Sequence, residues 1–110
     1  MDMYQFTKAE RRELRRLTGL AYERELSQAT GALQGQFERW RAGEINVFEL
    51  SELIHKFHNG VSRDLYCAYE LDKLPFGLAF AVANGIVEES EVAPEILEAI
   101  QHIIDLHRAR

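Results

Sequence analysis

One helical pattern runs without interruption from Lys8 to Ala42, and it limits how the rest of the chain can fold. Thr7 is a suitable N-cap, Glu10 lies three residues later as in a capping box, and no proline occurs before Pro75. These 35 residues would span roughly 52 Å as a helix. A compact chain of about 100 residues has a radius of gyration near 13 Å. We therefore expect this helix either to bend or to extend beyond the body of the protein.

Apolar residues recur along this segment at steps of mostly three and four, which is the spacing of one helical face. The stripe contains Leu14, Leu17, Ala21, Tyr22, Leu26, Ala29, Leu33, Phe37 and Trp40. A helix that extends beyond the body leaves the second half of this stripe without a partner in its own chain, and another molecule is the natural cover. We therefore predict an interface at Leu26, Ala29, Leu33, Phe37 and Trp40.

Gly31 and Gly35 lie inside this predicted helix and have two interpretations. Their G-x-x-x-G spacing allows a second helix to approach closely, although the motif is best known from membranes. Each glycine also weakens a helix interior by about 1 kcal/mol relative to alanine, which favours a kink or break. The sequence leaves both interpretations open.

Further start and stop signals predict four more helices, at about residues 47–58, 63–72, 75–84 and 94–108. Asn46 and Glu49 form a second capping box, and Asn59 with Gly60 is a suitable end for that helix. Ser62 is the expected cap of the third helix. Prolines suit the first turn of the last two helices. No long period-two strand pattern is present.

These patterns predict an all-α fold, a helical bundle of about five helices with a long first helix that the glycines can kink. A length of 110 residues with 46% hydrophobic content suits a single domain, residues 1–110. The segment at 75–84 is apolar all round, which indicates a central position in the core.

Membrane insertion is not expected from the sequence. The longest uncharged stretch, Leu74 to Val87, has fourteen residues, whereas a bilayer span needs about 20. The N-terminal residues include Asp2 and no apolar run, so we expect no secretory signal. The only cysteine is Cys67, which rules out an internal disulfide and favours the cytoplasm.

A concentration of positive charge marks the start of the long helix and suggests a second class of function. The cluster comprises Lys8, Arg11, Arg12, Arg15 and Arg16. Such a cluster can contact phosphates, so nucleic-acid binding is the alternative hypothesis. A solvated face paired locally with Glu10 and Glu13 is favoured, because the whole chain carries a formal charge of −5.

Catalytic chemistry has little support in the sequence. Glu52 and His55 are three residues apart, as in di-iron helical bundles, and His58 adds another such step, but only one copy of the motif exists. A metal-dependent enzyme centred on Glu52, His55 and His58 is therefore the least favoured hypothesis. Cys67 is expected to be an inert, half-buried thiol. The sequence leaves open whether the protein is an enzyme, although it favours a protein without catalytic activity. No cofactor is predicted.

The leading hypothesis is a small regulatory or protein-interaction module that acts by helix-mediated association, as a homodimer or with a different protein. The apolar stripe of the long helix is the surface on which this hypothesis depends. Nucleic acid is a less favoured partner.

Overall fold

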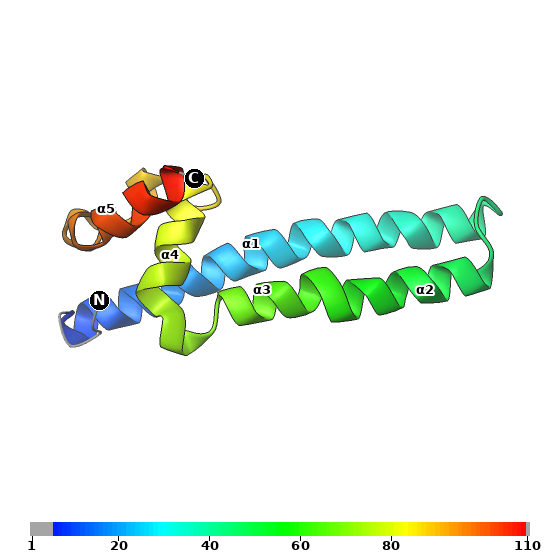
Figure 1. Cartoon of the computed structure of the whole chain (residues 1–110), viewed down its shortest axis with the longest axis horizontal. Coiled ribbons are helices and arrows are strands. Elements are labelled where there is room, and N and C mark those ends of the chain that lie inside the picture. The colour runs from blue at the N-terminus through cyan, green and yellow to red at the C-terminus, as the bar shows by residue number, and fades with distance from the viewer. Residues whose placement is uncertain (1–5, 110) are drawn as a thin grey trace.

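The chain folds into helices that form a long hairpin with a packed group at one end. The computed structural model describes residues 6–109, which contain no strand. α1 (Lys8–Arg41) runs the length of the molecule, and α2 (Val47–Phe57) and α3 (Arg63–Ala68) return antiparallel beside it (Figure 1). α4 (Leu74–Ala83) and α5 (Pro94–Arg108) lie near the N-terminal end of α1. The all-α prediction is confirmed.

The predicted capping chemistry sets where the two long elements begin. The Glu10 backbone N–H donates to Thr7 Oγ1 at 3.1 Å, and the Thr7 N–H donates to Glu10 Oε1 at 2.8 Å. Asn46 and Glu49 repeat this reciprocal arrangement at the start of α2. Each box pairs two backbone donors that the helix cannot satisfy internally, so both starts are fixed locally.

α1 is one continuous helix of 34 residues, so the kink or break that the sequence left open at Gly31–Gly35 does not occur. A Cβ built at either glycine would meet nothing within 4 Å, and therefore the close helix packing suggested for this pair is not present among residues 6–109 either. Propensity alone does not break the helix, because the return helices run beside it and continuous packing along one side supports it.

The predicted end of the second helix at Asn59–Gly60 is also wrong. A π-helical turn, η2 (His58–Ser62), carries the backbone from α2 into α3, and Ser62 makes no side-chain cap. α2, η2 and α3 therefore form one rod, which leaves four separate helices in place of about five. The rod ends at Ala68, earlier than the predicted residue 72. The short 3-10 turn η3 (Leu71–Lys73) then leads into α4.

The reversal between α1 and α2 depends on Gly43. Its φ of +78° lies in the left-handed region, which glycine adopts without strain. The Gly43 N–H donates to the Trp40 carbonyl, and the Glu44 N–H donates to the Arg39 carbonyl, so the last turn of α1 is closed by backbone bonds. This tight end brings α2 back alongside α1.

The hydrophobic core lies at the opposite end, where α4 packs against both α1 and α5. α4 is buried on most sides, as its uniformly apolar sequence predicts, and the expected central position is confirmed. The most completely buried large side chains belong to α1, α4 and α5 and to the connection before η4 (Glu89–Glu91): Leu14, Leu17, Pro75, Leu78, Ile96, Ile100, Ile104 and Val87.

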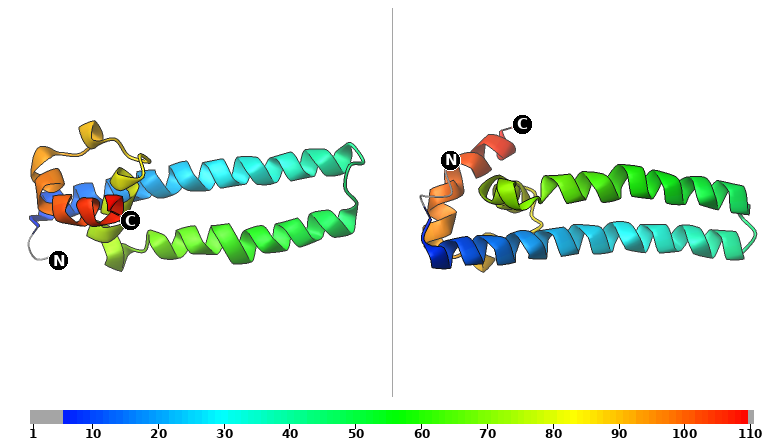
Figure 2. Two further views of the ribbon diagram at one scale, coloured as in Figure 1. Left: turned by 45° about the horizontal axis from the view of Figure 1, so that its top comes forward. Right: turned by 90° about the horizontal axis from the view of Figure 1, so that it is seen from below.

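The molecule is therefore not a compact bundle. Its principal extents are 53 × 24 × 21 Å, and its radius of gyration is 17.2 Å, above the 13 Å or so of a compact chain of this size. We call residues 22–68 the arm and the remaining described residues the head. Figure 2 shows the two rods of the arm side by side in both views, with the head at one end.

Candidate interaction surface

The arm has almost no interior of its own. Of residues 22–68, all of which the structure describes, only Ile45 and Leu50 are buried. Two helices can cover only one side of each other, because a third or fourth element is needed to enclose the contact. The apolar residues of the arm therefore lie along the line where α1 meets the return rod. We call this partly open line of contact the seam.

The predicted interface residues divide into two groups along α1. Leu26, Ala29 and Leu33 are half-buried, because the return rod partly covers this part of the stripe, and the expectation that the stripe lacks any partner in its own chain is wrong there. Phe37 and Trp40 stay 39% and 38% exposed, so the end of the stripe is open.

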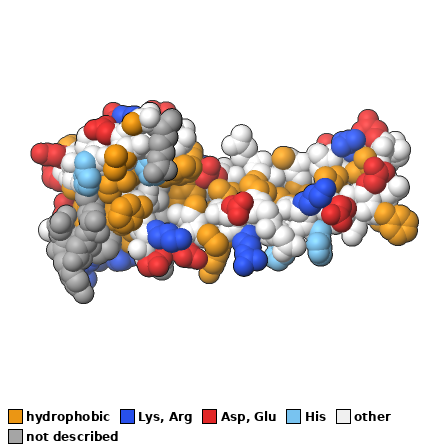
Figure 3. Space-filling view, viewed as in Figure 1, with side chains coloured by type: hydrophobic (Ala, Val, Ile, Leu, Met, Phe, Trp, Pro, Cys, Tyr) orange, Lys and Arg blue, Asp and Glu red, His pale blue; other side chains and the backbone are white. Residues whose placement is uncertain are grey.

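A groove follows the seam on one face of the arm. It consists of two adjoining hollows of about 530 and 390 Å³ that share Leu53 and Lys56. The inner hollow, nearer the head, is lined by Ala29, Ala32, Leu33, Gln36, Phe57 and Val61. The outer hollow, nearer the tip, includes Ile45 and Phe48. Figure 3 shows hydrophobic side chains along the line where the two rods of the arm meet.

Charged side chains of both signs border the outer hollow, namely Arg39, Glu49, Glu52 and Lys56. Two of these groups already have partners, since Glu49 caps α2 and Arg39 lies 3.5 Å from the Glu44 carboxylate. Among the described residues, neither Glu52 nor Lys56 forms an ion pair. The groove therefore offers one free carboxylate and one free ammonium group.

The other face of the arm is also apolar. Gln36 and Leu53 line the groove, and each lies three residues after an inward-facing residue, Leu33 and Leu50 respectively. A residue four positions after Leu33 or Leu50 points to the opposite side of its helix from a residue three positions after it. Because two antiparallel helices are related by a two-fold axis, the residues at this step of four, Phe37 and Ile54, lie on the same face of the arm, the face away from the groove. Ile54 is 38% exposed.

Polar contacts hold the base of the arm to the head. The Tyr69 hydroxyl donates to Glu25 Oε2 at 2.6 Å, and the Tyr22 and Tyr69 rings stack with centroids 6.0 Å apart. Burial, with this bond, raises the pKa of Tyr69 above its ordinary value. A hollow of about 620 Å³ lies here, and the buried Thr18 hydroxyl on its wall has no hydrogen-bond partner within the described residues.

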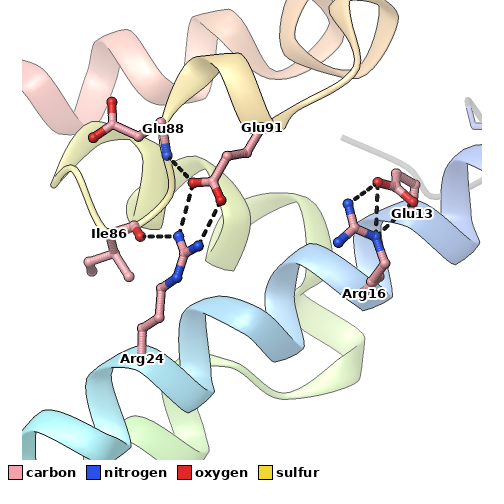
Figure 4. A network of polar contacts seen from close by, with 6 residues as sticks. All are labelled: Glu13, Arg16, Arg24, Ile86, Glu88 and Glu91. Carbon is pink, nitrogen blue, oxygen red and sulfur yellow. Dashed lines mark hydrogen bonds and ion pairs between the residues drawn. The ribbon is translucent and has the colours of Figure 1, made fainter.

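A second junction connects α1 to the segment before α5 (Figure 4). Arg24 donates to the Ile86 carbonyl at 2.8 Å and makes two bonds to the Glu91 carboxylate, at 2.7 and 2.9 Å. The Arg24 guanidinium, and then the Glu88 backbone N–H, lower the pKa of Glu91 to about 2. This bidentate pair orients η4 and thereby the start of α5.

The basic cluster is partly engaged within the chain. Arg16 pairs with Glu13, and Arg11 donates to the Phe6 carbonyl at 2.7 Å. Lys8, Arg12 and Arg15 are exposed on the first turns of α1. Nucleic-acid binding by these residues stays a prediction.

The residues proposed for a metal site lie on the arm surface. Glu52, His55 and His58 are all exposed. Within residues 6–109 no group of three or more His, Cys, Asp or Glu side chains is placed to hold a metal ion. Cys67 is exposed, and the expectation of a half-buried thiol is wrong, because α3 turns this residue away from α1.

Sequence reasoning missed the second wall of the groove and its exposed aromatic residue. Leu53 and Phe57 lie opposite Ala29 and Leu33 across the inner hollow, and this placement depends on the hairpin. Phe48, 81% exposed, follows the N-cap closely, and nothing in its sequence setting separates it from an ordinary core aromatic.

No protein-family model, curated protein or solved structure matches this chain. None of the described helices is both long enough and apolar enough to cross a bilayer.

Proposed function

We propose that the protein is an interaction module whose arm associates with helices of another polypeptide, either a second copy or a different protein. The observation that carries the proposal is how little of the arm is buried: between positions 22 and 68, only two residues are buried. Seven large hydrophobic side chains stay exposed on the same segment: Phe37, Trp40, Val47, Phe48, Ile54, Val61 and Tyr66.

The arm buries less of its apolar surface than the same residues would bury in a closed core. Burial of apolar area contributes about 25 cal/mol per Å², so residues left at 38 to 81% exposure contribute only part of what they would in a core. A helix laid along the seam would complete their burial, and apolar anchors in grooves are the usual centres of helix recognition. The head has its own core and can hold the base of the arm while the arm binds.

Photo-cross-linking from the arm tests this proposal. A photoreactive phenylalanine analogue at Phe48 probes the groove face, and one at Ile54 probes the opposite face. The same analogue at Leu106, which is 64% exposed on the head, is the matched control. We expect adducts in cells from an arm position and not from the control, and their mass identifies a second copy or a different protein.

The contradicting result is equally specific. If neither arm position yields more adduct than Leu106, the arm has no partner and the proposed function is wrong. Because both side chains are exposed in the isolated chain, we expect the analogue to leave the fold intact, and circular dichroism of the purified variants checks this expectation.

A further inference from the structure

Resting on the proposed function, we infer that the partner is a second copy of this chain, seated groove to groove so that the two arms run antiparallel and form a four-helix bundle. The groove has a protruding aromatic side chain at one end and an apolar hollow at the other. Its free charges are of opposite sign. Both features match a copy of the same surface turned by a two-fold axis.

The first feature is Phe48, the most exposed large hydrophobic residue of the described chain at 81%. It lies in the outer hollow, on the first turn of α2. At the other end of the groove, Ala29 and Ala32 leave the inner hollow of about 390 Å³ between α1 and the turn around Phe57 and Val61. In an antiparallel pair the Phe48 ring of one copy would fill the inner hollow of the other.

The second feature is the pair of free charges on α2. Glu52 and Lys56 are four residues apart, so both project along the same side of the helix. A two-fold axis between them would place Glu52 of each copy beside Lys56 of the other. A partner of strongly acidic or basic character would satisfy only one of these groups, whereas a second copy satisfies both.

The two features agree on one register. The midpoint between Glu52 and Lys56 is residue 54, and Leu53, beside it, is shared by the two hollows. The turn that lines the inner hollow is the one around Phe57 and Val61. The midpoint along the rod between Phe48 and this turn also lies beside Leu53. One axis near Leu53 therefore satisfies the shape and the charge requirements together, which gives the arms the closed symmetry of a dimer.

The mass of the purified full chain in solution tests the inference over a wide range of concentration. We expect association toward twice the 12.7 kDa of one chain. Phe48→Ser should raise the dissociation constant at least tenfold, and Leu106→Ser, which removes an exposed side chain of the head, should not change it. Circular dichroism should show unchanged helicity for both variants.

Charge exchange tests the register. Glu52→Lys and Lys56→Glu should each weaken self-association, because like charges then face each other in both symmetric contacts. An equimolar mixture of the two variants should restore a dimer, because a mixed pair places two lysines against two glutamates. If the mixture does not restore association, the register is wrong.

Two results would overturn the inference in different ways. If the wild-type chain stays monomeric at every concentration, a second copy is not the partner. If it dimerises but Phe48→Ser dimerises equally well, the groove is not the interface. Neither result by itself removes the proposed function, which fails only when cross-linking from both faces of the arm yields no adduct.

Discussion

Two pairs of side chains at the base of the arm connect segments that are distant in sequence. The Tyr69 hydroxyl donates a hydrogen bond to the Glu25 carboxylate at 2.6 Å, and Arg24 donates hydrogen bonds to the Glu91 carboxylate and the Ile86 carbonyl. None of these partners could be identified from spacing, because each contact joins residues that are more than 40 positions apart. Single-residue changes here should alter the stability of the fold without touching the groove.

Tyr69→Phe should lower the free energy of unfolding by roughly 1 to 3 kcal/mol, because the Glu25 carboxylate loses a charge-assisted hydrogen bond while the ring stays buried. Chemical denaturation measures this change. Tyr66→Phe is the matched control, since Tyr66 is 62% exposed and should lose less than about 0.5 kcal/mol. Equal effects of the two substitutions would contradict the assigned role of the Tyr69 bond.

Acid should destabilise the protein in part through Glu91. Its pKa falls from an ordinary value of 4.5 to about 2 in the folded chain, so between these values the unfolded chain binds the proton more readily. The stabilisation is complete above pH 4.5 and is lost as the pH falls toward 2. Thermal unfolding midpoints measured against pH should fall less steeply for Glu91→Gln than for the wild type.

The exposed Glu38 supplies the control for this titration. Glu38→Gln should leave the acid slope of the wild type unchanged. Parallel pH profiles for the wild type and Glu91→Gln would show that the Arg24 contact does not stabilise the fold.

At the scale of helices, the capping residues in the sequence predicted where helices begin more accurately than where they end. Thr7–Glu10 and Asn46–Glu49 set two starts, and the predicted range 94–108 matches α5, which begins at Pro94. Asn59 and Gly60 resemble a helix end, but a π turn accommodates them, because α1 lies alongside and supports the rod. A residue-by-residue pattern contains no information about such a neighbour, and the groove was missed for the same reason.

Gly31→Ala should stabilise α1 by about 1 kcal/mol, because the helix is continuous there and the added methyl group meets nothing within 4 Å. The midpoint of thermal unfolding should rise. Gly77→Ala should lower it instead, since a Cβ at that position of α4 would lie 3.2 Å from the Ala68 carbonyl oxygen.

The pair of glycine variants also tests the straightness of the arm. A helix that bends at Gly31 in solution would gain nothing from alanine, and a loss of stability in Gly31→Ala would contradict the continuous α1. The Gly77→Ala result shows that the assay detects a change of the opposite sign.

At the scale of the whole molecule, the head and the arm differ in how completely they are packed. The head encloses most of its apolar residues, whereas the arm leaves apolar side chains exposed along the line where its two rods meet (Figure 3). The length of α1 predicted this imbalance from sequence, but the covering of Leu26, Ala29 and Leu33 by the return rod required the structure. A one-sided hairpin opens more readily than a core, so its amides should be the least protected.

Amide hydrogen exchange of the full chain, compared between the arm and the head, tests most directly whether the arm is incomplete alone. At low concentration the amides of residues 26–40 and 47–61 should exchange much faster than those of α4. Their exchange should slow as the concentration rises or a bound partner covers the seam, while the head should stay unchanged. Arm amides that exchange as slowly as those of α4 at every dilution would contradict the account.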